Sequence, residues 1–218
     1  MSKKIDFSIY EVQKKPFVLG YRLIILLLGL VDLAYANVTS ILGGTLLTPD
    51  KYFTYQSNAL VLIWLILALL WRNNPEKLDK ICGPIRGAIT VYISVTFIVY
   101  GIVLAPLSNP TGIGAIQNLI HHYLNPVVFI LDFFYTERKQ YRWIYILPWL
   151  IYPHLYLIFS FIFGSITGDY IYFFLDYPQL GFIKYLMWYI ILFSLIIILS
   201  VIYIVYNRYY GSKKLVNS

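Results

Sequence analysis

A hydroxyl and an imidazole stand near the starts of two apolar segments of this chain. Thr54 lies in one segment and His121 in the other. A threonine hydroxyl becomes a nucleophile when a neighbouring base takes its proton, and an imidazole is a common base. The serine–histidine dyad works in the same way and is recognised by geometry, not by order in the chain. The pair therefore suggests acyl transfer, in which Thr54 attacks an acyl carbon and His121 accepts the proton.

Five further polar residues are candidates for supporting roles. Asp32 can orient an imidazole, and Asn58 and Asn118 can donate hydrogen bonds to an oxyanion. His122 and Asn125 lie in the same segment as Asn118. All have structural interpretations too, since polar side chains in membrane helices often bond to a neighbouring helix, and a threonine often bonds to its own helix.

Common catalytic motifs are absent from the sequence. It contains no Gly-x-Ser-x-Gly elbow, no His-Glu-x-x-His and no glycine loop after a strand. The two adjacent histidines lack the carboxylate spacing of a membrane di-iron enzyme. Cys82 is the single cysteine, so no internal disulfide and no cysteine-based metal cluster can form. We therefore expect neither a metal nor a cofactor.

Six long apolar stretches must position these side chains. Each has about 18 to 25 residues, enough to cross a hydrocarbon core as a helix. Apolar residues make up 60% of the chain and charged residues 12%, which excludes an ordinary soluble domain. We expect one all-α domain over residues 1–218, a six-helix transmembrane bundle. The expected spans are 17–36, 54–71, 87–106, 116–135, 143–163 and 182–206.

Lysine and arginine gather in alternate connections. The N-terminal tail, the second-to-third and fourth-to-fifth connections and the C-terminal tail hold most of them, whereas the other three hold only Lys51 and Lys184. Cytoplasmic loops collect Lys and Arg, so both termini are expected in the cytoplasm. The net charge of +7 follows from this bias. No basic patch lies on a soluble domain, so we expect no nucleic-acid partner.

The first segment has one alternative interpretation. Ala34-Tyr35-Ala36 after a leucine-rich run resembles a signal-peptidase site, but Asp32 and the length of the run favour a retained span. The richness in Ile, Tyr, Lys and Asn suits a bacterial genome. We expect an integral protein of a bacterial plasma membrane.

The orientation predicts the depth of the candidate residues. Thr48 suits a helix N-cap and Pro49 the first helical position, so Thr54 would lie roughly 8 Å below the outer start of its helix. Polar groups in a lipid-facing position are costly, so Thr54 and His121 should face inward. We expect a cavity in the outer half, lined by the first, second and fourth spans, with an apolar floor and the connection 164–181 near its mouth.

Other polar residues are expected to be structural. Asp132 lies near the cytoplasmic end and should pair with Arg138 or Arg142 without a role in chemistry. Arg22, near a helix end, should extend toward the interface. His154 follows a proline and should bond the carbonyl that the proline frees.

Short motifs resemble a known family. Lys51–Thr54 resembles the Lys-Tyr-Leu-Thr of the androgen-induced membrane proteins, whose histidine precedes a proline by five residues, as His121 precedes Pro126. Members are threonine hydrolases of fatty acid esters of hydroxy fatty acids. The resemblance implies a Thr54 nucleophile and a His121 base. Residues 53–58 resemble a bacterial six-span relative more closely, and His122 departs from the animal pattern.

Two functional hypotheses follow from these observations. The first is an intramembrane hydrolase that acts on a lipid or another acyl ester. The second is a non-enzymatic lipid-binding protein or small-solute transporter that uses the same cavity. Transporters often contain inverted repeats and broken helices, and no repeat is visible here, which favours the hydrolase.

Overall fold

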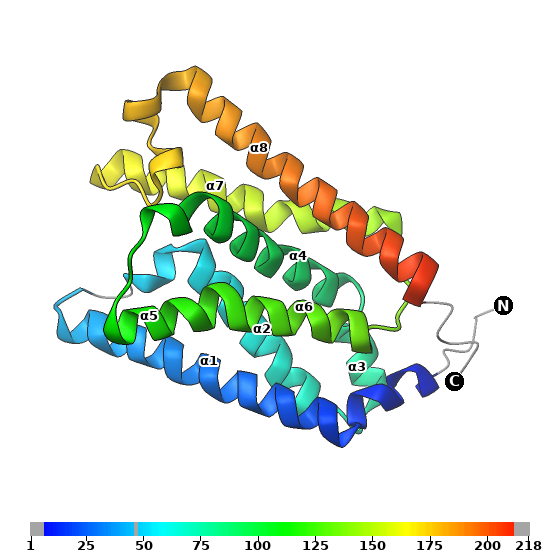
Figure 1. The fold of residues 1–218 in the computed structure, drawn as a ribbon. Coiled ribbons are helices and arrows are strands. Elements are labelled where there is room, and N and C mark those ends of the chain that lie inside the picture. Colours follow the sequence, from blue (N-terminus) through cyan, green and yellow to red (C-terminus); the bar gives the residue numbers. More distant parts are fainter. Residues whose placement is uncertain (1–6, 46–47, 212–218) are drawn as a thin grey trace.

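The computed structural model describes residues 7–45 and 48–211, which form helices and connections, with no strand in these two ranges (Figure 1). The described ranges contain eight α-helices: α1 (Pro16–Leu42), α2 (Phe53–Leu70), α3 (Pro75–Ile81), α4 (Pro84–Val99), α5 (Gly112–Leu119), α6 (Asn125–Thr136), α7 (Ile146–Thr167) and α8 (Tyr177–Tyr206). Short 3₁₀ turns are η1 (Phe7–Lys14), η2 (Pro49–Lys51), η4 (Ala105–Leu107), η6 (Trp143–Tyr145) and η7 (Phe173–Leu175). Three π-turns are η3 (Tyr100–Leu104), η5 (Ile120–Leu124) and η8 (Asn207–Gly211).

Five helical stretches in the described ranges are long and apolar enough to cross a membrane, which indicates an integral membrane protein. They are Pro16–Leu42, Phe53–Leu70, Pro84–Leu107, Trp143–Thr167 and Tyr177–Tyr209. The remaining expected span, 116–135, is occupied by α5, η5 and α6 in succession (Figure 1). Its two histidines and Asp132 make it less apolar than the other five. The helix that carries the candidate base is therefore also the most polar one.

Several helix boundaries differ from those expected. Helix α1 continues to Leu42. Helix α2 begins at Phe53 after the separate turn η2, and Thr48 makes no side-chain cap bond. Thr54 thus lies in the first turn of α2 and not deep within it. Helix α8 begins early, at Tyr177, and is interrupted by Gly181, whose φ of 69° only glycine adopts readily.

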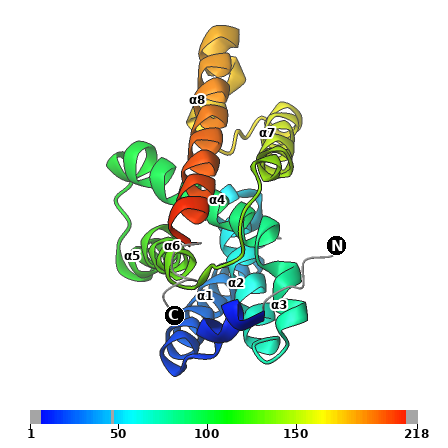
Figure 2. The same ribbon diagram turned by 90° about the vertical axis from the view of Figure 1, so that its right-hand side faces the viewer.

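The long helices alternate in direction. Connections 43–45 and 48–52, 108–111 and 168–176 lie at one end. Connections 71–83 and 137–145 lie at the other end, as do η1 and η8, the first and last described elements (Figure 1). Most lysines and arginines therefore lie at one end of the bundle. Helix α4 packs on α2, α6, α7 and α8, and lies between the α1–α2 pair and the α7–α8 pair (Figure 2).

A buried ionic cluster joins the helices at the charged end. Asp132 Oδ1 lies 2.9 Å from Nη2 of Arg22, and its Oδ2 lies 2.7 Å from Nη2 of Arg86. All three side chains are at most 1% exposed. The expected partners of Asp132, Arg138 and Arg142, were therefore wrong. Arg22 does not extend to the interface, because a buried carboxylate binds its guanidinium.

The cluster extends through further polar and aromatic contacts. Glu137 Oε2 lies 3.8 Å from Nη1 of Arg86, so two acidic and two basic groups balance in charge. The Tyr21 hydroxyl donates to Asp132. The guanidinium carbons of Arg22 and Arg86 lie 5.0 and 4.4 Å from the Trp64 ring centroid, within cation–π range. The cluster thus connects α1, α2, α4 and α6.

His154 also differs from its expected role. It is exposed on α7, and its Nδ1 hydrogen-bonds the Tyr189 hydroxyl of α8 at 2.7 Å. It therefore ties two helices together instead of satisfying a backbone carbonyl.

The Asp132→Asn variant should unfold far more easily than the wild type. The change leaves Arg22 and Arg86 without their shared carboxylate, and breaking a buried ion pair costs about 3–5 kcal/mol. Thermal unfolding in detergent, followed by helical circular dichroism, measures the loss. Glu11→Gln is the control, since it removes an exposed pair with Lys14 and should cost less than about 1 kcal/mol. Equal losses in both variants would contradict this role of the cluster.

Candidate functional site

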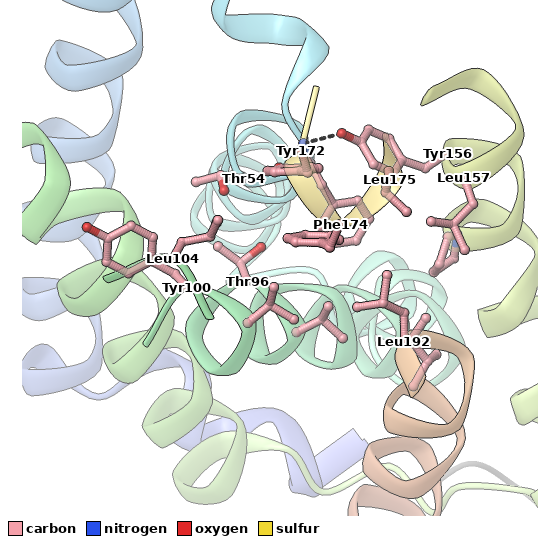
Figure 3. Close-up of a pocket in the computed structure, with 15 residues that line it drawn as sticks. Thr54, Thr96, Tyr100, Leu104, Tyr156, Leu157, Tyr172, Phe174, Leu175 and Leu192 are labelled. Atoms are coloured by element: carbon pink, nitrogen blue, oxygen red, sulfur yellow. Dashed lines mark hydrogen bonds between the residues drawn. The ribbon is translucent and has the colours of Figure 1, made fainter. Parts of the chain in front are cut away.

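Thr54 lies where two cavities meet at the end opposite the ionic cluster. The first, the apolar cavity, has a volume of about 60 Å³ and is walled by α2, α4, η3, α7, η7 and α8 (Figure 3). The second, the tyrosine cavity, has a volume of about 380 Å³. It is lined by Tyr52, Thr54, Tyr55, Tyr100, Leu104, His122, Ile171, Tyr172 and Phe173. The Thr54 side chain contributes to both walls.

The first turn of α2 gives Thr54 a free backbone donor. The N–H of Phe53 donates to the Tyr156 hydroxyl at 3.0 Å (Figure 3). In the described part of the chain the N–H of Thr54 has no partner. The first N–H groups of a helix point out of its end and carry partial positive charge. This N–H can stabilise a negative charge that develops beside the Thr54 hydroxyl.

His121 is held by a buried carboxylate. Its Nδ1 lies 2.9 Å from Oδ2 of Asp32 on α1, and both residues are buried. The Tyr55 ring lies 5.0 Å from the imidazole. A carboxylate at Nδ1 fixes the orientation of an imidazole and leaves Nε2 as the reactive nitrogen. His121 and Asp32 therefore have the arrangement that the last two members of a catalytic triad require.

Asn58 ties the nucleophile segment to the histidine segment. Its Nδ2 donates to the backbone oxygen of Thr54 at 2.9 Å and to that of His121 at 3.0 Å. Its Oδ1 accepts from Nδ2 of Asn125 at 3.0 Å. Asn58 is 1% exposed, so no solvent competes for these bonds. Asn58 and Asn125 thus position the backbone of both candidate residues.

The π-turn η5 directs the side chains of His121 and His122 into the bundle. In η5 the N–H of Asn125 bonds to the oxygen of Ile120, five residues earlier. Pro126 lacks an N–H, so it cannot make the usual helical bond, and a π-turn inserts one extra residue. His121 then faces Asp32, whereas His122 stacks on Tyr100 with ring centroids 3.5 Å apart. Tyr100 itself begins the π-turn η3.

The two adjacent histidines are placed differently with respect to Thr54. His122 lines the tyrosine cavity with Thr54, and His121 lines neither cavity. Within residues 7–45 and 48–211, no hydrogen bond joins the Thr54 hydroxyl to an imidazole. Asn118 is partly buried on α5 and lines neither cavity. The structure brings Asp32, Asn58, His121 and Asn125 into one network beside Thr54.

The walls of the cavities differ from those expected. Helix α1 contributes to neither cavity, whereas α7 and α8 line the apolar one. A separate cavity of about 360 Å³ does lie between α1, η2, α2 and α5, but neither Thr54 nor His121 lines it. The connection near the mouth is in the expected place, since Ile171, Tyr172 and Phe173 line the tyrosine cavity.

Tyr172 is a site residue that sequence reasoning missed. Tyr172 lines both cavities together with Thr54, and its hydroxyl lies close to those of Thr54 and Tyr156. Burial raises the pKa of Tyr172 to about 12, so the phenol is neutral at physiological pH. The only signal in the sequence is the aromatic run 170–174, which does not show that Tyr172 folds back onto Thr54.

No group of three or more His, Cys, Asp or Glu side chains in the described ranges is arranged to hold a metal ion. The arrangement instead offers a hydroxyl, a carboxylate-bound imidazole and a free helix N–H. These groups are suited to acid–base and nucleophilic chemistry.

No protein-family model matches the chain, and searches of curated proteins and solved structures also return no match.

Replacing Asn58 by Ala should loosen the contact between α2 and η5. The Thr54 oxygen keeps its bond from the Ser57 hydroxyl, but the His121 oxygen and Asn125 lose their bonds to Asn58, at about 1–3 kcal/mol for a buried unsatisfied group. Thermal unfolding in detergent measures the cost. Asn37→Ala is the matched control, because Asn37 makes one bond, to Leu33 of its own helix, and is partly exposed. A cost for Asn58→Ala no greater than for Asn37→Ala would rule out the bridging role.

Proposed function

We propose that this protein is an intramembrane hydrolase of acyl esters with Thr54 as nucleophile and His121 as base. One observation carries the proposal: Thr54 lies at the junction of an apolar cavity and a more polar one, and Asn58 joins its backbone oxygen to that of His121, whose imidazole binds the Asp32 carboxylate. The apolar cavity, at about 60 Å³, would take the first carbons of an acyl chain, which needs no polar partner. The ester carbonyl would then lie at Thr54 and the alcohol in the tyrosine cavity.

The proposed reaction has two halves. The Thr54 hydroxyl loses its proton to Nε2 of His121 and its oxygen bonds the carbonyl carbon. The N–H of Thr54 stabilises the oxyanion. The carbon–oxygen bond to the alcohol then breaks, and the alcohol leaves with the proton from His121. Water, activated by His121, hydrolyses the acyl-threonine and releases the fatty acid.

The Thr54 hydroxyl must turn for the first step. In the structure it lies near Tyr172, and the imidazole of His121 faces Asp32. A change of threonine rotamer moves the hydroxyl without disturbing the helix. Catalytic hydrogen bonds often form only when substrate is bound. Substrate in the tyrosine cavity would move the Tyr172 side chain away from Thr54 and leave the Thr54 hydroxyl free to turn.

The charge distribution and the sequence resemblance support the membrane setting. The lysine- and arginine-rich end would face the cytoplasm, with both termini there and six spans in total. The site would then lie in the outer half of a bacterial plasma membrane. The Lys51–Thr54 segment and the His121–Pro126 spacing support membership of the androgen-induced family of threonine hydrolases.

A second candidate is a lipid-binding protein without catalysis. The observation that favours it is that Tyr172 lines both cavities beside Thr54, whereas no hydrogen bond within the described ranges joins the Thr54 hydroxyl to an imidazole. In that function the apolar cavity would hold an acyl chain, and Asp32 and His121 would serve only to join α1 to η5. The two experiments below separate the candidates.

The Thr54→Ala variant should lose covalent labelling by a fluorophosphonate probe, because the probe phosphonylates only an activated hydroxyl. In-gel fluorescence of the purified protein measures the label. Thr39→Ala is the matched control, since the Thr39 hydroxyl bonds to its own helix on α1 and should leave labelling intact. Labelling of full intensity in Thr54→Ala would show that Thr54 is not the nucleophile, and no labelling of the wild type would favour the binding protein.

His121→Asn and Asp32→Asn should each lower kcat, whereas His122→Asn should retain most of it. Loss of a general base costs about 10²–10⁴-fold. Hydrolysis of p-nitrophenyl decanoate measures the rate, and the melting temperature of each variant serves as the folding control. A severe loss in His122→Asn with a near-normal rate in His121→Asn would reassign the base to His122.

A further inference from the structure

The tyrosine cavity offers polar contacts but no charge. Among the described residues, no Lys, Arg, Asp or Glu side chain lines it or the apolar cavity. Its polar atoms are the hydroxyls of Thr54 and of four tyrosines and the imidazole of His122. Hydroxyls and a neutral imidazole both donate and accept hydrogen bonds, so they suit uncharged oxygen atoms of a ligand.

Two charged groups adjoin residues that line the tyrosine cavity, and each already has a partner. Lys51 lies 5.5 Å from the Tyr52 ring, but its Nζ binds Oδ2 of Asp169 at 2.6 Å. The ring of Tyr55, which lines the cavity, lies 5.0 Å from that of His121, which binds the Asp32 carboxylate. Like charges repel strongly where water is scarce. A second carboxylate or a phosphate in this cavity would therefore be disfavoured.

His122 presents one free edge to the tyrosine cavity. Its Nδ1 is buried without a partner, and stacking on Tyr100 fixes its ring. The His121 ring packs against it at 4.6 Å between centroids. No acidic group of the described ranges is bonded to His122, so its contact with a ligand is that of a neutral ring, through Nε2. This edge can bond a hydroxyl or carbonyl oxygen.

We infer that the alcohol part of the ester is uncharged and carries hydroxyl or ester oxygens, as in an acylglycerol, and that His122 binds it. This inference rests on the proposed hydrolase function and specifies its substrate class. It departs from what the family resemblance implies. An ester of a hydroxy fatty acid carries a free carboxylate on its alcohol part, and among the residues that the structure describes no unpaired cation lines the tyrosine cavity to receive it.

The test compares two substrates that differ only in charge. One is a decanoyl ester of a hydroxy fatty acid with a free carboxylate, and the other is its methyl ester. The wild-type protein in detergent should hydrolyse the methyl ester with a kcat/KM at least about tenfold higher, since an unpaired carboxylate is costly to desolvate. A decanoyl monoacylglycerol should also be hydrolysed faster than the free acid.

A designed cation provides a second test. Phe173 lines the tyrosine cavity and is 49% exposed, so it can be replaced without opening the core. Phe173→Lys should reduce the preference for the methyl ester by about tenfold, through attraction of the free carboxylate. Phe173→Gln, the matched uncharged control, should keep the wild-type preference.

Binding to Thr54→Ala separates failure of this inference from failure of the hydrolase proposal. Ether analogues of the free acid and of the methyl ester cannot be cleaved, and their affinities follow from the rise in melting temperature. Tighter binding of the methyl form without any turnover by the wild type would support the inference and contradict the hydrolase. Turnover of the free acid that equals or exceeds that of the methyl ester would overturn the inference and leave the hydrolase standing.

Discussion

One carboxylate shared by two buried arginines determines how the helices of this bundle are aligned. Asp132 on α6 binds Arg22 of α1 and Arg86 of α4, and all three are almost fully buried. A charge at this depth is stable only with its partners in place, so the three helices cannot slide past one another. Farther along α1 a second contact joins the same two segments, because Asp32 of α1 binds His121 of η5, which lies between α5 and α6.

The two bridges have different spacing along the two helices. Arg22 and Asp32 are ten residues apart (32 − 22), whereas His121 and Asp132 are eleven apart (132 − 121). Two antiparallel helices of equal rise would need equal spacing. The π-turn η5 lies within the longer interval and contributes the extra residue. The same turn directs His121 to Asp32 and His122 to Tyr100, so one local irregularity both corrects the alignment and forms the site.

Sequence reasoning predicted the features that depend on composition and one-dimensional pattern. The apolar runs indicated the long helices, and the charges indicated which connections share an end. The free-energy cost of exposing a polar side chain to lipid indicated that Thr54, Asn58 and His121 face inward. Sequence reasoning failed where the partner of a charged side chain lies far away in the chain. Arg22 was interpreted as an interface residue, and Asp132 was paired with arginines close to it in sequence. It also missed Tyr172, because nothing in an aromatic connection shows which ring folds inward, and it missed the π-turn, which breaks the helical period on which face assignments rest.

The central claim is that Thr54 becomes acylated during turnover. The most direct measurement is peptide mapping by mass spectrometry after the purified protein is mixed with p-nitrophenyl decanoate and quenched in acid within the first turnover. The account predicts a decanoyl group on the peptide that contains Thr54, and its absence when the quench follows exhaustion of substrate. A decanoyl group on Tyr172, on His122 or on any other residue, or rapid turnover with no acylated peptide, would contradict it.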